Sequence, residues 1–198
     1  MSLIYGLGIN NGKYPAKSDK KHLKEYSLWC SMLSRCSPKM WLTKQSYTNT
    51  ILSDNFKDYS YFYEWCQGQV GFGNTDENGI SWHLDKDLLV KGNKLYSEVT
   101  CIFIPSKINN LLTKREYSRG SYPIGVYLDK RNSKFMTRCS NGLGKDIYLG
   151  SFKCPIEAFK AYKTFKENYI KQIAEQYKLQ IDSRVYKALV NYEVEITD

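Results

Sequence analysis

The part of the sequence that most restricts the fold lies between residues 124 and 177. Three short runs of apolar and β-branched residues, 124–128, 134–139 and 146–152, are separated by the turn-forming stretches DKRNS and SNGLGK. Pro155 then opens a long stretch in which large apolar residues recur with the spacing of one helical face. This face comprises Phe159, Tyr162, Phe165, Tyr169, Ile173 and Tyr177. The pattern predicts a three-stranded antiparallel sheet packed on a long helix.

The first half of the chain has two helical patterns and a second small β unit. Residues 22–36 and 55–67 have helical spacing, and Ser37-Pro38 should end the first helix. The run 82–104 has two apolar stretches around a Gly-Asn turn, and Pro105 precedes a short helical pattern at 106–112. The sequence thus predicts a strand, a loop, a strand and a helix, in an α+β chain that ends with a helix from about Asp182.

The chain length of 198 residues allows one ordinary domain or two small ones. A polar, charged stretch at 114–121 should bury little, so it is interpreted as a linker. This interpretation gives a first module at 1–113 and a second module at 122–198.

The charge of the chain points to a polyanionic partner. Lysine and arginine outnumber the acids by 29 to 20, a net charge of +9. No apolar run reaches the length of a membrane helix and no export signal is visible, which predicts a cytosolic protein without a membrane partner. The six cysteines contain no CxxC pair, and the spacing of Cys30 and Cys36 does not suit a zinc site, so reduced thiols are expected.

Five blocks of sequence carry a resemblance to a known family. In chain order they are GLGINNGKYP, WCSMLSRC, LDKDLLVKGNKLYSEVTCIFIPSKIN, YPIGVYLDKRNSKF and LGSFKCPIEAF, which cover nearly the whole chain. Together they resemble the HNH homing endonucleases of short-tailed bacteriophages. The resemblance implies a strand-loop-strand-helix finger that holds one divalent metal ion, hydrolysis of DNA phosphodiesters, and a location in the cytoplasm of the infected bacterial host.

The resemblance places candidate site residues on the 82–112 segment. Asp85 and Asp87 on the first strand and Asn109 on the helix would hold Mg²⁺ or Mn²⁺ through oxygen atoms. The Asp-His pair of a standard finger is replaced by Asp85-Lys86, so the usual general base is missing. His83 lies two residues before Asp85 and should point to the same face, where it could act as a displaced base. An ordinary histidine and a solvated carboxylate pair are the alternatives.

The second module resembles the plant ethylene-response-factor (APETALA-type) DNA-binding domain, which lays its sheet in the major groove. Strand alternation puts Phe135, Thr137 and Cys139 on one face and Lys134, Met136 and Arg138 on the other. The residues expected to contact DNA are Tyr127, Arg131, Lys134, Arg138 and Tyr148. Asp146 departs from the basic residue usual in that domain. A sheet with one solvated basic face is the alternative interpretation.

Three functions are consistent with these patterns. The first is a metal-dependent endonuclease acting on double-stranded DNA. The second is a sequence-specific DNA-binding protein with a degenerate, inert nuclease site. The third is a phage protein that inhibits a host factor. A nucleotide cofactor is not expected, because the glycines of SNGLGK lack the Gly-Lys-Ser/Thr ending and the following helix of a phosphate-binding loop.

Overall fold

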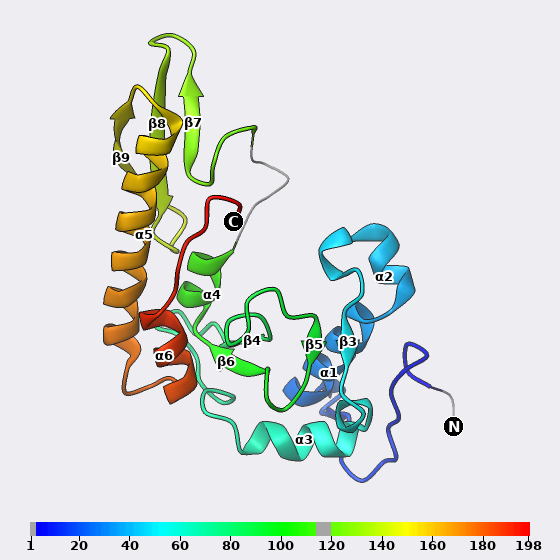
Figure 1. Ribbon diagram of the computed structural model, residues 1–198. Coiled ribbons are helices and arrows are strands. Elements are labelled where there is room, and N and C mark those ends of the chain that lie inside the picture. The colour runs from blue at the N-terminus through cyan, green and yellow to red at the C-terminus, as the bar shows by residue number, and fades with distance from the viewer. Residues whose placement is uncertain (1–2, 114–119) are drawn as a thin grey trace. The chain divides into compact units, whose positions relative to one another are not determined.

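The structure is a computed structural model that describes residues 3–113 and 120–198, and it has the predicted α+β composition (Figure 1). Residues 114–119 of the predicted linker lie outside the described residues. The chain divides into two compact units: unit 1 contains Met1–Asn74 and Trp82–Phe103, and unit 2 contains Thr75–Ser81 and Ile104–Asp198. The helix at 106–112 therefore belongs to unit 2, whereas the division based on the sequence placed it in the first module.

Unit 1 combines helices with very short strands. Its helices are α1 (Lys24–Arg35), α2 (Pro38–Thr43) and α3 (Tyr59–Gln67), with 3₁₀ turns η1 (Gln45–Tyr47) and η2 (Asn55–Lys57). Its strands are β1 (Lys17–Ser18), β2 (Lys21–His22), β3 (Ile51–Leu52), β4 (His83–Asp85), β5 (Leu95–Tyr96) and β6 (Ile102–Ile104), the last residue of which falls in unit 2.

The strands of this region form three two-stranded pairs. Strand β1 pairs with β2 in antiparallel orientation, β3 pairs with β5 in parallel, and β4 pairs with β6. The predicted order of strand, loop, strand and helix over 82–112 is present as β4, loop, β6 and α4 (Ser106–Leu112). The first strand is shorter than the predicted run of 82–90. The parallel pairing of β5 with β3 was not predicted.

The core of unit 1 explains its helices. Trp29, Met32 and Leu33 recur at helical spacing on α1 and are buried, as are Phe62 and Cys66 on α3. The indole Nε1 of Trp29 donates to the carbonyl oxygen of Phe56 (2.8 Å), which satisfies its buried polar atom. Asp58 caps α3 by accepting from the amide of Ser60 (2.6 Å). The aromatic side chains of α3 are thus mainly core.

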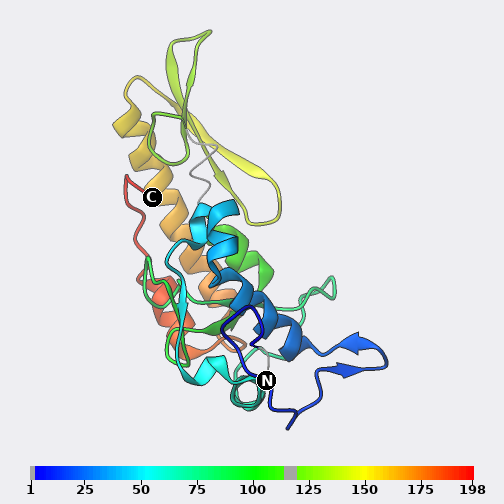
Figure 2. The same ribbon diagram turned by 90° about the vertical axis from the view of Figure 1, so that its right-hand side faces the viewer.

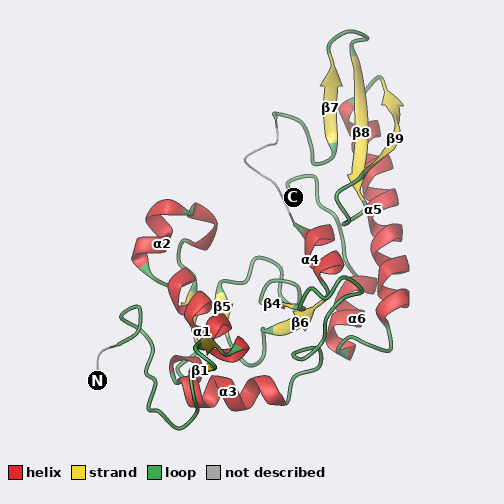
Figure 3. Cartoon of the chain, turned by 180° about the vertical axis from the view of Figure 1, so that it is seen from behind, coloured by secondary structure: helices red, strands yellow, loops and turns green. Residues whose placement is uncertain are grey.

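Unit 2 contains the predicted sheet and long helix. Strands β7 (Val126–Asp129), β8 (Lys134–Ser140) and β9 (Asp146–Phe152) are antiparallel and adjacent in that order. Helix α5 (Pro155–Tyr177) lies along one face of this sheet, and α6 (Ser183–Val190) follows it, capped by Asp182 (Figure 3).

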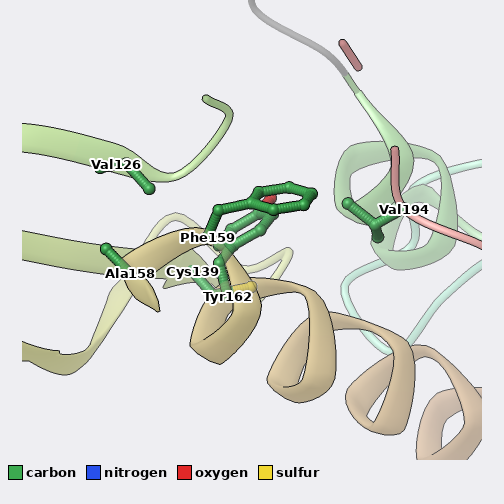
Figure 4. Packing of buried hydrophobic residues seen from close by; sticks show 6 residues of the cluster. All are labelled: Val126, Cys139, Ala158, Phe159, Tyr162 and Val194. Atoms are coloured by element: carbon green, nitrogen blue, oxygen red, sulfur yellow. The ribbon is translucent and has the colours of Figure 1, made fainter. Parts of the chain in front are cut away.

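The inner face of the sheet packs on α5 through a small apolar cluster (Figure 4). The cluster consists of Val126, Cys139, Ala158, Phe159, Tyr162 and Val194. Gly125 has φ +76°, and a Cβ there would lie 2.1 Å from the ring of Tyr162, so only glycine fits. The close approach of β7 to α5 depends on this residue.

The buried side of α5 differs in two respects from the predicted face. Lys166 is buried, and its Nζ donates to the carbonyl oxygen of Leu111 at the end of α4. Phe165, Tyr169 and Tyr177, which the pattern placed on the buried face, are only partly buried. The lysine can occupy a core position because its ammonium reaches an unsatisfied helix-end carbonyl.

The cysteines are all free thiols, and four of the six are buried. Burial raises the pKa of the Cys36 and Cys101 thiols to about 12, and it raises the pKa of the Cys66 and Cys139 thiols as well. Among the described residues, no helix combines the length and the apolar character needed to cross a membrane.

Candidate nucleic-acid interface and the Asp85 turn

The face of the β7–β9 sheet that points away from α5 is the candidate nucleic-acid interface, here called the outer face. It carries Tyr127, Lys134, Met136, Arg138 and Tyr148. Thr137 and Cys139, which alternate with them on β8, are buried on the other side. The alternation predicted for β8 is therefore confirmed.

A β-bulge brings Tyr148 to the outer face. Across β8 and β9, Met136 pairs with Ser151 and Arg138 pairs with Tyr148, with a register shift between Thr137 and Arg138. The shift leaves Leu149 as an extra residue, which packs towards the inner cluster. Tyr148, whose side chain is about half exposed (53%), thus points outward next to Arg138.

The guanidinium group of Arg138 packs against an aromatic ring on the outer face. The guanidinium carbon of Arg138 lies 5.4 Å from the ring centroid of Tyr127, within the range of a cation–π contact. Within residues 3–113 and 120–198, neither Arg138 nor Lys134 forms an ion pair. The five donors of Arg138 are therefore held in place by Tyr127 while they remain available to a ligand.

Two acidic residues flank these cations. Asp129 pairs with Lys134 across β7 and β8, but its carboxylate accepts from the amide (3.0 Å) and Nε (3.3 Å) of Arg131. Hydrogen bonds from Arg131 lower the pKa of Asp129. Asp146 pairs with Ser140 at the far end of the face and is exposed. Arg131 is thus tethered in the β7–β8 turn, and Asp146 places a negative charge at the edge of the outer face.

The second candidate site is the turn that follows β4, here called the Asp85 turn (residues 85–88). Asp85 Oδ1 accepts from the backbone amides of Asp87 and Leu88, both at 2.8 Å. These bonds bend the chain and end the strand at Asp85. The strand alternation that placed Asp87 on the same face as His83 and Asp85 therefore does not reach Asp87.

The carboxyl group of Asp85 is largely removed from water, and this burial raises its pKa. The neighbouring Asp87 carboxylate raises the pKa of Asp85 further, while the amides of Leu88 and Asp87 and the charge of Lys86 lower it. No described residue donates to Asp85 Oδ2. The backbone of Asp87 thus lies against the Asp85 carboxyl group, and a cation beside that group would stabilise the charged form of Asp85.

Lys86 occupies the position where the HNH resemblance calls for histidine, and it has a structural role. Its side chain is buried. Its Nζ donates to Asp87 Oδ1 and to the carbonyl oxygen of Asn93 (2.9 Å), and it lies over the ring of Tyr96. Because its ammonium is held by these groups, Lys86 fixes the turn from within.

Asn93 is a site residue that the sequence pattern did not single out. Its Nδ2 donates to the carbonyl oxygens of Lys86 (2.8 Å) and Leu95 (2.7 Å), and its Oδ1 accepts from the amide of Leu95 (3.1 Å). These bonds tie the Asp85 turn to β5. The Gly92-Asn93 turn signal located this loop, but it did not reveal that the amide side chain crosses it.

The other two predicted site residues lie on separate elements. His83 is half-buried on β4, two residues from Asp85, so both side chains lie on the same face of that strand. Asn109 lies on α4, where its backbone amide donates to the carbonyl oxygen of Pro105 (3.0 Å). Helix α4 belongs to unit 2, whereas the Asp85 turn belongs to unit 1.

The fit of the Asp85 turn to a metal ion can be judged from its donors. Among the described residues, no group of three or more His, Cys, Asp or Glu side chains is arranged to hold a metal. Asp85 and Asp87 nevertheless offer two carboxylates, which suits Mg²⁺ bound by one or two carboxylates and completed by water and phosphate oxygens. The residues fit a hydrated, weakly held ion and do not fit a cage made of protein ligands alone.

Comparison of the chain with protein-family models, with curated proteins and with solved structures gave no match in any of the three.

Proposed function

We propose that the protein binds double-stranded DNA through the outer face of the β7–β9 sheet. The observation that carries this proposal is the arrangement of Arg138 over Tyr127 and beside Tyr148, on a face where Lys134 is also exposed. A guanidinium with free donors can bind the O6 and N7 atoms of guanine in the major groove. The ammonium group of lysine and the hydroxyl group of tyrosine commonly bind phosphate, and the net charge of +9 favours a polyanionic partner.

A second candidate function is supported by the Asp85 turn. We propose that this turn hydrolyses a DNA phosphodiester with the help of a divalent metal ion. The supporting observation is the pair of adjacent carboxylates in which burial raises the pKa of Asp85. When bound, the metal would neutralise charge on the scissile phosphate and activate a water molecule.

Each residue of the site would have a separate role in this hydrolysis. Asp85 Oδ2 and the Asp87 carboxylate would hold the metal, while Asp85 Oδ1 remains committed to the turn. His83, on the same face of β4, would accept the proton of the attacking water. Lys86 cannot serve as the base, because its Nζ is buried and donates to Asp87 and Asn93.

One experiment tests both candidates. Fluorescence anisotropy with labelled duplex DNA, repeated at several salt concentrations, should show binding in which the logarithm of the affinity falls linearly with the logarithm of the salt concentration. The same duplexes incubated with Mg²⁺ or Mn²⁺ should be cleaved, and EDTA should abolish cleavage. Binding without cleavage under any of these conditions would leave the DNA-binding function alone. Absence of binding at low salt would overturn both functions.

A further inference from the structure

The strands β1 and β2 form a hairpin that stands at the surface of unit 1. Figure 2 shows it as a pair of blue arrows that extends away from α1. Every residue from Lys17 to His22 is exposed, and the segment contains three lysines, Lys17, Lys20 and Lys21, and a single acid, Asp19. The hairpin therefore presents a concentrated positive charge and buries no apolar side chain of its own.

The base of the hairpin is firmly attached to the core of unit 1. The amide of Leu23 donates to the carbonyl oxygen of Ala16 (3.0 Å), and the hydroxyl of Tyr59 donates to the carbonyl oxygen of Pro15 (3.0 Å). The ring of His22 also packs edge-on against Tyr26, with 5.1 Å between centroids. An isolated two-stranded hairpin of this length is at best marginally stable in water. The attachments at its base therefore hold a polar tip in one place.

The turn of the hairpin has an uncommon backbone. Asp19 and Lys20 have φ values of +49° and +65°, in the left-handed region. Two successive positive φ values match the twist of a tight hairpin, but such turns favour Asn and Gly, and lysine rarely occupies them. The tip thus keeps a lysine where glycine would adopt the backbone conformation with less strain, which suggests a role for the charge.

The charges of this hairpin differ from those of two other surface lysines in the same unit, which form ion pairs. Lys13 pairs with Glu64 (2.5 Å) and Lys57 pairs with Asp54 (2.7 Å). In the part of the chain that the structure describes, Lys17, Lys20 and Lys21 take part in no ion pair. Their ammonium groups are therefore available to an external anion.

We propose that the hairpin of residues 17–22 is a second DNA contact, in which Lys17, Lys20 and Lys21 bind the phosphate backbone of duplex DNA. This inference rests on the proposed DNA-binding function. Lysines act on phosphates as mobile point charges, so the hairpin contributes affinity without reading the base sequence. Base recognition and phosphate binding would then be divided between the outer face in unit 2 and the hairpin in unit 1.

The test compares two triple variants of the full chain that lose the same charge. Lys17→Gln/Lys20→Gln/Lys21→Gln removes the hairpin lysines, and Lys39→Gln/Lys44→Gln/Lys57→Gln removes three exposed or partly exposed lysines elsewhere in unit 1. Duplex affinity is measured by anisotropy over a range of salt concentrations. Each phosphate contact contributes about 0.9 to the slope of log affinity against log salt. The hairpin variant should lose about two to three units of this slope, roughly 0.9 per lysine, and bind about tenfold more weakly or worse.

The control variant separates this inference from a general charge effect. If both triple variants lose the same slope, the hairpin makes no specific contact and the inference is wrong. If the unsubstituted protein shows no salt-dependent binding at all, the proposed function itself fails. A sequence preference that persists in the hairpin variant while its affinity falls supports the division of roles.

A further variant guards against unfolding of the hairpin. Lys20→Asn removes one charge and places a residue that tolerates positive φ in the turn. It should lower the salt slope by about one unit with an unchanged thermal midpoint. The charge-preserving triple Lys17→Arg/Lys20→Arg/Lys21→Arg should retain the slope. An unchanged slope for Lys20→Asn together with a reduced slope for the arginine triple would overturn the inference.

Discussion

The Asp85 turn and the outer face of the sheet both concentrate charged residues, but the two regions use them differently. In the Asp85 turn the charges are engaged within the protein: Asp85 accepts two amides, and Lys86 is buried against Asp87 and Asn93. On the outer face Arg138 lies over the ring of Tyr127 and is exposed to water. Residue type alone therefore does not reveal function. The burial and the partners of a charged side chain decide whether it stabilises the fold or is available to a ligand.

The largest effect is expected from Asp85, where two roles can be separated. Asp85→Asn keeps an oxygen that accepts from the amides of Asp87 and Leu88 but removes the charge that a metal requires. It should lower the cleavage rate by about a thousandfold, because a metal contributes several kcal/mol to such a reaction. Gel assays with Mg²⁺ measure the rate, and anisotropy should show nearly unchanged DNA binding.

Asp85→Ala is the matched comparison, because it removes the turn hydrogen bonds as well. It should abolish cleavage and also lower the thermal midpoint, whereas Asp85→Asn should not lower it. Full cleavage by Asp85→Asn would show that this carboxylate does not hold the metal, and the Asp85 turn would then be purely structural.

His83 should show the next largest effect. His83→Ala removes the imidazole on the face of β4 that carries Asp85, and the loss of a general base lowers a rate by about a hundredfold or more. Single-turnover cleavage over a range of pH values measures this effect. An unchanged rate would leave solvent as the base, because the Lys86 ammonium is held inside the turn.

Arg138 should dominate specificity on the outer face. Arg138→Ala should weaken binding to the preferred duplex by about 1–3 kcal/mol and relax the preference at one base pair. Arg138→Lys retains the charge but loses the two-pronged donor geometry, so it should restore affinity for random DNA without restoring the preference. Competition assays with single-base variants of the duplex measure both. Equal losses on every sequence would mean that Arg138 contacts phosphate.

Lys134 is expected to have a smaller, sequence-independent effect. Lys134→Ala should reduce the salt slope by about one unit and lower affinity equally on all duplexes. Both the affinity and the slope come from anisotropy titrations in increasing salt. A loss confined to one sequence would instead place the Lys134 ammonium at a base edge.

The smallest expected effect concerns pH and stability. Because burial raises the pKa of folded Asp85 above the ordinary value of 3.8, the folded state binds a proton more tightly than the unfolded state. The free energy of unfolding should therefore fall as pH rises from about 3.8 through the raised pKa, and the Asp85→Asn variant should lack this decrease. Thermal melts of both proteins across this range measure the difference. Mg²⁺ at neutral pH should raise the midpoint of the unsubstituted protein only.

The elements with local signals could be predicted from the sequence. The helices at α1, α3 and α5 follow apolar spacing, and β7, β8 and β9 follow from short apolar runs between turn residues. The outward orientation of Lys134 and Arg138 also followed from alternation along one strand. These features depend on residues close together in the chain.

Features that depend on distant partners could not be predicted in this way. The parallel pairing of β3 with β5 joins residues 44 positions apart in the chain, such as Ile51 and Leu95, and local periodicity does not record contacts at that separation. The burial of Lys86 and Lys166 could not be predicted from the sequence either. A lysine is buried in a core only where acceptors are available for its ammonium group, here the carbonyl oxygens of Asn93 and Leu111. The end of β4 at Asp85 depends on hydrogen bonds made by a side chain to its own turn.

The buried thiols give the protein internal reporters of local unfolding. Cys36, Cys66 and Cys101 lie in unit 1 and Cys139 lies beneath the outer face in unit 2, and burial raises the pKa of each. The thiolate is the form that attacks a thiol-reactive reagent, so modification of a buried thiol requires the surrounding structure to open. With Cys30 and Cys154 replaced by serine, the labelling rate at Cys139 against that at Cys101 would measure how often each unit opens while the rest of the chain stays folded.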